Sequence, residues 1–214
     1  MSIQQDYSWI GNIQHTKGQA TKLRIIESAI RLFSEKGFAN VTLQMIGEDS
    51  GTSHPLILKH FGTKNNLLLG VRKFVTFSNH KWVDAKIKPT QTAREKLFCH
   101  CIENLRWAIA NRSEGKIILL TYYHESLDQS PTQSAGVQAL SLGTQRIEAY
   151  LQQMQREGFQ FGKRDSRMLA EMVHEYLLGV YSYMLTTTPA STKRLPKSYQ
   201  DKLETFFSLL FDPK

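Results

Sequence analysis

The sequence predicts an all-α fold of about nine helices. Apolar residues recur at spacings of three and four through most of the chain, and glycine or proline separates the segments in which they do so. No segment shows the alternation of apolar and polar residues that is typical of a half-buried strand. The chain has 214 residues, of which 41% are hydrophobic and 21% are charged, so it can bury an ordinary core.

The first predicted helix begins near Gln19 and ends at Gly37. Residues 1–18 show no sustained period, so we expect a mobile tail there. The lysines and arginines of the helix lie away from its apolar positions, which indicates one buried face. The apolar stripe consists of Leu23, Ile26, Ile30 and Phe33.

Two short helices are predicted next, and the first begins after Thr42. Thr42 is a good N-cap residue, and Val41 and Ile46 occupy the two positions of a hydrophobic staple. Gly51 stands where a helix ends in a left-handed residue.

The second short helix is expected over residues 54–60. Thr52 or Ser53 can cap it, and Pro55 lies in its first turn, where a missing N–H costs little. Two short helices joined by a turn that contains glycine form a helix-turn-helix, whose second helix enters the major groove of DNA.

The rest of the chain is expected to form a helical bundle. The stretch 116–127 is so apolar that its period alone does not distinguish a helix from a buried strand, and we predict a helix because its surroundings are helical. The second half of the helix at 165–185 is apolar nearly all round, so it must pack in the core or against a partner chain. The predicted helices cover about residues 63–85, 92–111, 116–127, 131–156, 165–185 and 198–211.

Charge and cysteine content point to an intracellular protein with a polyanionic partner. The net charge is +8, and residues 1–75 hold nine Lys/Arg against five Asp/Glu, although a solubilising surface explains such an excess equally well. Cys99 and Cys101 point in different directions on a helix, so no disulfide between them is expected. No apolar run approaches the roughly 20 residues of a membrane span, and no secretion signal is evident, so the expected location is the cytoplasm.

The segment from Leu23 to Leu68 resembles the TetR family of bacterial transcription regulators. The resemblance rests on "RLFSEKGF", "VTLQMIG", "SGTS", "HF" and "TK" with a leucine pair, in the family's spacing without gaps. Beyond Val75, only the number, length and order of the helices agree.

The resemblance implies a homodimeric, ligand-responsive transcriptional regulator, a repressor, that binds a near-palindromic operator in double-stranded DNA. Residues 19–70 would form the DNA-binding domain. Residues 71–214 would bind a small, largely apolar effector and dimerise through about 165–185 and 198–211. The effector would change the spacing of the two recognition helices and release the operator. Neither a cofactor nor contact with a membrane is expected.

Three residues depart from the family pattern. The family usually has glycine at Pro55, alanine at Gly47, and tyrosine at Leu58, where the tyrosine commonly meets the phosphate backbone. These departures keep a second interpretation open, a helical adaptor with the same fold that has lost sequence-specific DNA binding.

The expected DNA contacts lie on and around the second short helix. Thr42, Lys59 and Lys64 are the expected phosphate contacts, whereas His54, Pro55 and Leu56 are the expected base contacts. The alternative for each is a capping or solvated residue, and His60 is better explained as structural because Phe61 must enter the core. The full expected set is Thr42, Thr52, Ser53, His54, Pro55, Leu56, Lys59, His60 and Lys64.

The effector pocket is expected to use aromatic side chains with a few polar anchors. Ordinary core packing is the alternative for each of its candidates. A metal site is not expected at Cys99, His100, Cys101 and His124, because consecutive residues on a helix cannot converge on one ion. The pocket candidates are Trp107, Tyr122, Tyr123, His124, Tyr176 and Tyr181.

An enzyme is the rival class. His124-Glu125 and His174-Glu175 lack the second histidine, four residues after the first, that a zinc-protease helix needs. The sequence also contains no phosphate-binding glycine loop and no nucleophile elbow. We therefore do not expect an enzyme.

Overall fold

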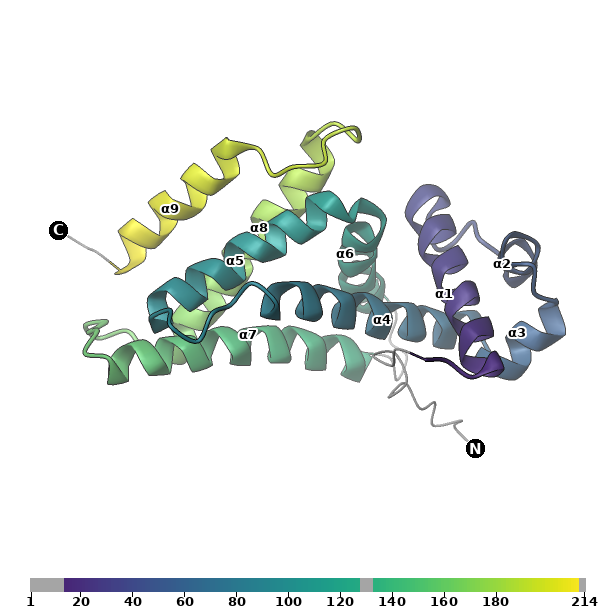
Figure 1. Cartoon of the computed structure of the whole chain (residues 1–214), viewed down its shortest axis with the longest axis horizontal. Helices are drawn as coiled ribbons and strands as arrows, with labels where there is room; N and C mark the ends of the chain where they lie inside the picture. The colour runs from purple at the N-terminus through teal and green to yellow at the C-terminus, as the bar shows by residue number, and fades with distance from the viewer. Residues whose placement is uncertain (1–13, 128–132, 212–214) are drawn as a thin grey trace. The chain divides into compact units, whose positions relative to one another are not determined.

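The computed structural model describes residues 14–127 and 133–211, and the side chains of residues 121–141 are not described. The described part contains nine helices and no strand, which confirms the all-α prediction (Figure 1). The chain divides into two compact units, 1–80 with 113–124, and 81–112 with 125–214. Two helices, α4 (Lys64–Asp84) and α6 (Arg112–Leu127), contribute residues to both units.

The first unit begins with α1 (Lys17–Lys36), which starts two residues earlier than predicted. The reason is a capping box: the Thr16 hydroxyl accepts from the backbone N–H of Gln19, and the Gln19 side chain accepts from the backbone N–H of Thr16. Leu23 is only half-buried, whereas Ile25 and Ala29 are fully buried. The buried face of α1 is thus wider than the predicted stripe, because α2 packs against it.

The helix-turn-helix consists of α2 (Leu43–Ser50) and α3 (His54–Phe61), with the bounds close to those predicted. Its core is formed by large side chains that are at most 2% exposed, so the two short helices are held by tertiary packing. These side chains are Ile25, Ile26, Phe33, Ile46, Ile57 and Phe61.

The second unit is built from α5 (Ala93–Ala110), α7 (Gln133–Arg156), α8 (Ser166–Thr187) and α9 (Lys197–Phe211). α7 packs against α8, α5 packs against both, and α9 packs against α5. The predicted helix start at Pro131 lies outside the described residues. α8 runs two residues further than predicted, and the Arg112 guanidinium donates to the carbonyls of Leu185 (2.8 Å) and Thr188 (2.9 Å) at its end.

A glycine allows α7 and α8 to approach closely. A Cβ on Gly143 would lie 2.8 Å from Nε2 of His174, so any larger residue would require that ring to move. On the next residue, the Thr144 hydroxyl lies 3.0 Å from Nδ1 of His174. Burial lowers the pKa of His174.

Among the described residues, none of the helices combines the length and apolarity needed to span a lipid bilayer.

Candidate nucleic-acid interface

Local capping fixes the entry to α2 and its end. The Thr42 hydroxyl accepts a hydrogen bond from the backbone N–H of Met45 at 3.1 Å, and the staple residues Val41 and Ile46 are both fully buried. Gly51 ends the helix in the left-handed region, at φ 62°, as the sequence predicts. Thr42 is exposed at the N-terminus of α2 but its hydroxyl already has this capping role.

Gly47 allows α2 to contact the turn that follows it. A Cβ on Gly47 would lie 2.6 Å from the backbone oxygen of Thr52, a distance that real Cβ atoms essentially never show. The sequence shows this glycine only as a departure from the family's usual alanine, whereas the structure shows that it permits a close backbone approach.

The expected DNA contact at Thr52 is less accessible than the residues on either side of it. Thr52 is only 6% exposed, and its hydroxyl donates to the backbone oxygen of Ser50 at 3.5 Å. The residue is buried because it lies in the tight turn between α2 and α3. The next residue, Ser53, is exposed and is the N-cap of α3, but its side chain makes no capping hydrogen bond.

α3 presents one exposed stripe, which consists of His54, Pro55, Leu58 and Lys59. These positions follow the helical spacing of four, and Ile57 and Phe61 anchor the opposite face in the core. Leu58, which is not among the predicted contacts, is 39% exposed. Leu56 is half-buried beside the stripe.

The two lysines near α3 have different environments. Lys59 is exposed on the stripe. Lys64 is half-buried: its ammonium lies 4.3 Å from the ring centroid of Phe38 and donates to the backbone oxygen of Ala39 at 3.5 Å. Burial lowers the pKa of Lys64. Lys64 therefore helps to hold the start of α4 against the loop after α1.

His60 is half-buried at the C-terminal end of α3. Its ring centroid lies 6.4 Å from that of Phe61. Burial, and then the charges of Lys22 and Lys59, lower the pKa of His60, which favours the neutral ring at physiological pH. This environment supports the structural interpretation of His60.

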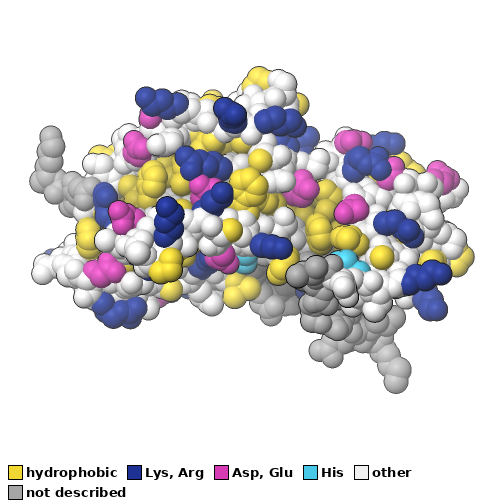
Figure 2. Space-filling view, in the orientation of Figure 1, with side chains coloured by type: hydrophobic (Ala, Val, Ile, Leu, Met, Phe, Trp, Pro, Cys, Tyr) yellow, Lys and Arg dark blue, Asp and Glu magenta, His cyan; other side chains and the backbone are white. Residues whose placement is uncertain are grey.

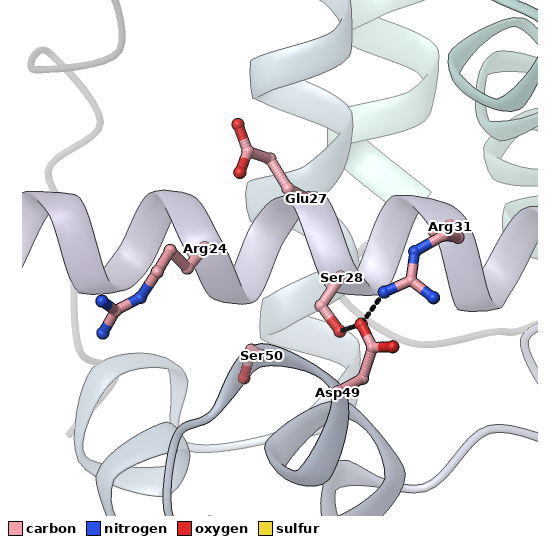
Figure 3. Close-up of a pocket in the computed structure, with 6 residues that line it drawn as sticks. All are labelled: Arg24, Glu27, Ser28, Arg31, Asp49 and Ser50. Carbon is pink, nitrogen blue, oxygen red and sulfur yellow. Dashed lines mark hydrogen bonds and ion pairs between the residues drawn. The ribbon is translucent and has the colours of Figure 1, made fainter.

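A polar cluster that the sequence did not predict joins α1 to α2. The Asp49 carboxylate accepts hydrogen bonds from the Ser28 hydroxyl and the Arg31 guanidinium, whereas Glu27 points away from it (Figure 3). Arg31 and then Ser28 hold the pKa of Asp49 below its usual range. The two helices bring together residues 18 to 21 positions apart, which no local pattern shows. A pocket of about 240 Å³ surrounds the cluster and includes Arg24 and Ser50.

The charged side chains of the first unit do not form a single-sign surface on the face seen in Figure 2. Lys and Arg side chains lie among Asp and Glu side chains over α1–α3 in that view. On that face, attraction to phosphate therefore depends on individual residues and not on a uniform positive surface.

Three candidates for the effector pocket can be placed. Trp107 on α5 and Tyr181 on α8 are core residues, 1% and 4% exposed. Tyr176 packs between α8 and α9: its ring stacks on Phe206 at 3.8 Å, and its hydroxyl donates to the backbone oxygen of Lys202 at 3.1 Å. The side chains of the other three lie outside the described part of the chain, namely Tyr122, Tyr123 and His124.

The second unit has a pocket that is not lined by any of the predicted effector residues. It has a volume of about 460 Å³ and lies along α5, with Phe98 and Ile102 among its apolar residues and arginines and glutamates at its edge. Over the residues that can be described, no group of three or more His, Cys, Asp or Glu side chains is arranged to hold a metal ion. Cys99 and Cys101 are both free thiols.

The family model described as "Bacterial regulatory proteins, tetR family" matches residues 25–71, which contain the helix-turn-helix. Residues 25–71 of this chain are therefore similar to the DNA-binding domain of the TetR family. The match covers the capped turn and the exposed stripe of α3, so it agrees with the structure in placing this family's DNA-binding motif at residues 41–61.

Similarity to known proteins is local in sequence and extensive in structure. The chain is 43% identical over 53 residues to the uncharacterized HTH-type transcriptional regulator YerO of Bacillus subtilis, a segment that spans 25% of this chain and 18% of YerO. A transcriptional regulator from Saccharomonospora viridis, solved in complex with choline, is 24% identical with a TM-score of 0.74 and covers 88% of this chain and 96% of its own. AibR, solved with isovaleryl coenzyme A and operator DNA, is 14% identical with a TM-score of 0.68 and covers 91% of this chain and 100% of its own.

Proposed function

We propose that this protein is a ligand-responsive transcriptional regulator of the TetR family, a repressor, that binds a near-palindromic operator as a homodimer. The observation that carries the proposal is the exposed stripe of α3, which lies between the turn at Gly51 and the buried anchor Phe61. A short helix fixed in this way can enter a major groove without rearrangement. The protein acts in the cytoplasm, where bacterial DNA is accessible.

The proposed roles of the residues around α3 follow from their positions on α2 and α3. His54, Pro55 and Leu56 contact base edges at the N-terminal end of the recognition helix. Thr42, Ser53 and Lys59 contact phosphate, and the N-terminal ends of α2 and α3 add backbone N–H groups. Lys64 contributes its charge from the edge of the domain, and His60 supports the helix from within.

Dimerisation through α8 and α9 is supported by apolar side chains that these helices expose. On α8, Met168 is 40% exposed, Met172 is 42% exposed and Tyr183 is 60% exposed. On α9, Leu209 is 74% exposed. Gly179 lies between the methionines and the tyrosine on α8 with open space around it, so a partner helix can approach closely there. We propose that a second copy covers this surface.

The effector is proposed to be a small, largely apolar molecule bound in the C-terminal domain. Two proteins of the same fold support a ligand-binding role, since one was solved with choline and the other with isovaleryl coenzyme A. The proposed lining includes Trp107 and Tyr181 on α5 and α8, with Tyr176 at its edge, because pockets in helical bundles use aromatic side chains. Tyr122, Tyr123 and His124 complete the proposed set.

The apolar part of the α3 stripe favours a second candidate function. Pro55 and Leu58 make half of the α3 stripe apolar, and neither side chain can hydrogen-bond to phosphate. A helical adaptor that has lost its operator would show such a surface. For that protein, DNA binding would be weak and indifferent to sequence, and Lys59→Ala would hardly change it.

Footprinting with the purified full-length protein on DNA upstream of its own gene distinguishes the regulator from the adaptor. The regulator should protect two symmetric half-sites about one helical turn, ~34–36 Å, or a modest multiple of it, apart. Addition of a cognate effector should remove the protection. A single unsymmetrical half-site would count against the dimer, and uniform weak protection at all sequences would support the adaptor.

A further inference from the structure

The recognition stripe of α3 is unusually poor in groups that can read hydrogen-bond patterns. Of its four residues, Pro55 and Leu58 offer only carbon atoms, so His54 and Lys59 are the polar members. The whole helix, "HPLILKHF", contains no Asp, Glu, Asn, Gln or Arg. The side chains that make the common bidentate contacts with guanine and adenine are therefore missing, apart from lysine.

Pro55 and Leu58 lie one turn apart and together form a small apolar ridge. Leu58 is 39% exposed and Pro55 is exposed as well. Neither can turn inward, because Ile57 (0% exposed) and Phe61 (1% exposed) already fill the buried side of the helix. The ridge is therefore a fixed feature of the surface that α3 presents.

In the major groove, the apolar feature that a base pair presents is the C5-methyl group of thymine. We propose that the Pro55–Leu58 ridge reads thymine C5-methyl groups, which makes the operator one with T·A pairs where the middle of α3 crosses each half-site. The inference rests on the proposed function and adds a class of target sequence to it. 5-Methylcytosine carries a methyl group at the same place, so methylation of a cytosine at that position mimics thymine.

Charge favours DNA over a protein partner as the occupant of the ridge. Lys59 follows Leu58 directly on the stripe, and Lys64 lies just beyond the helix. No acidic residue occurs from Gly51 to Lys64. An apolar ridge beside cations suits a groove lined with methyl groups and flanked by phosphates.

The test uses duplexes in which thymine is replaced by deoxyuridine, which removes only the methyl group and keeps the base pair. The sites are those recovered by selection from random DNA with the full-length protein. Replacing one contacted thymine by deoxyuridine should weaken binding by about fourfold, and replacing the symmetric pair should weaken it by about 16-fold. At a position where cytosine replaces thymine, 5-methylcytosine should restore about the same factor of four over cytosine.

Leu58→Ala assigns the effect to the ridge. This variant should bind the thymine and deoxyuridine duplexes with similar affinity, at the affinity of the wild-type protein for the deoxyuridine duplex. Leu142→Ala is the matched control, since Leu142 is 58% exposed on α7 and belongs to the other unit; it should keep the full deoxyuridine effect. Thermal unfolding should show both variants folded, because both leucines are on the surface.

The outcomes distinguish failure of the methyl readout from failure of the proposed regulator function. If specific sites are recovered but deoxyuridine changes nothing, or Leu58→Ala keeps the wild-type response, the methyl readout is overturned and the regulator remains. If no specific site is recovered, the proposed function and this inference both fail.

Discussion

The helix-turn-helix and the C-terminal unit hold their helices in different ways. In the first, caps and a turn within a few residues set where α2 and α3 begin and end, with Thr42 at one end and Gly51 in the middle, and packing on α1 then holds the two helices in place. In the second, the contacts that align helices join distant residues, as between Thr144 and His174 or from Arg112 to the end of α8. A local motif can be damaged without loss of the rest, whereas damage to a long-range core spreads over several helices.

The largest effects should come from the anchors of the two regions. Phe61 is 1% exposed and Phe207 is 2% exposed, so replacing either by alanine should cost about 3–5 kcal/mol of unfolding free energy. Phe61→Ala should abolish operator binding while the dimer persists, because Phe61 fixes only α3. Phe207→Ala should weaken the dimer, because it supports α9 against Phe98 on α5. Denaturant unfolding and sedimentation measure both, and loss of the dimer in Phe61→Ala would break the comparison.

Two glycines give the next largest effects. Gly47→Ala places a Cβ against the backbone oxygen of Thr52, which cannot move without opening the turn, so we expect a loss of about 1–3 kcal/mol and weaker DNA binding. Gly143→Ala meets the His174 ring, a side chain that can rotate, so its cost should be smaller. Urea unfolding of the two variants shows which substitution lowers the free energy of unfolding more. A stabilised Gly47→Ala protein would show that helix propensity, worth about 1 kcal/mol, outweighs the contact.

The polar cluster at Asp49 predicts an acid-sensitive first unit. Asp49→Asn should cost about 1 kcal/mol, because it weakens the acceptor of Ser28 and Arg31. The pKa of Asp49 is lower in the folded protein than in the unfolded chain. The stabilisation is therefore complete above the ordinary aspartate pKa of about 4 and is lost as the pH falls through the lowered value.

Unfolding at a series of pH values measures this contribution. The difference between the wild type and Asp49→Asn should shrink as the pH drops below about 4. Asp201→Asn, which removes an exposed carboxylate from α9, is the matched control and should leave the acid profile unchanged. A difference between wild type and Asp49→Asn that is independent of pH would contradict the role of the charge.

The smallest effects should separate the two lysines near α3. Lys59→Ala should weaken binding equally on all sequences and reduce the salt slope by about one, because it removes a phosphate contact. Lys64→Ala should do the same and also lower stability by about 0.5–1 kcal/mol, since its ammonium packs on Phe38. Titrations at several salt concentrations, with melting curves, measure both. A sequence-dependent loss in Lys59→Ala would instead place this lysine at a base edge.

The sequence predicted best those structural features that depend on a few neighbouring residues. The N-cap at Thr42, the left-handed Gly51 and the bounds of α3 depend on a few neighbouring residues, and all three predictions are confirmed. The burial of Thr52 could not be predicted, because it depends on how closely α2 approaches the turn at Gly47.

The features that the sequence did not predict depend on contacts between residues that are distant in the chain. The Asp49 cluster requires α1 and α2 to meet, and the position of Tyr176 between α8 and α9 requires the packing of those helices. An amphipathic pattern indicates that a helix has a buried face but does not say which helix covers it. The effector residues and the DNA contacts therefore both stay predictions, whereas the bounds and the exposed face of α3 are defined residue by residue.

The central claim is that the exposed face of α3 reads base edges, and selection from a random DNA pool tests it most directly. The wild-type protein should enrich near-palindromic sequences, and His54→Ala or Leu56→Ala should change the preferred bases at symmetric positions of both half-sites. Enrichment of no sequence by the wild type, or identical preferences in all three proteins, would contradict it.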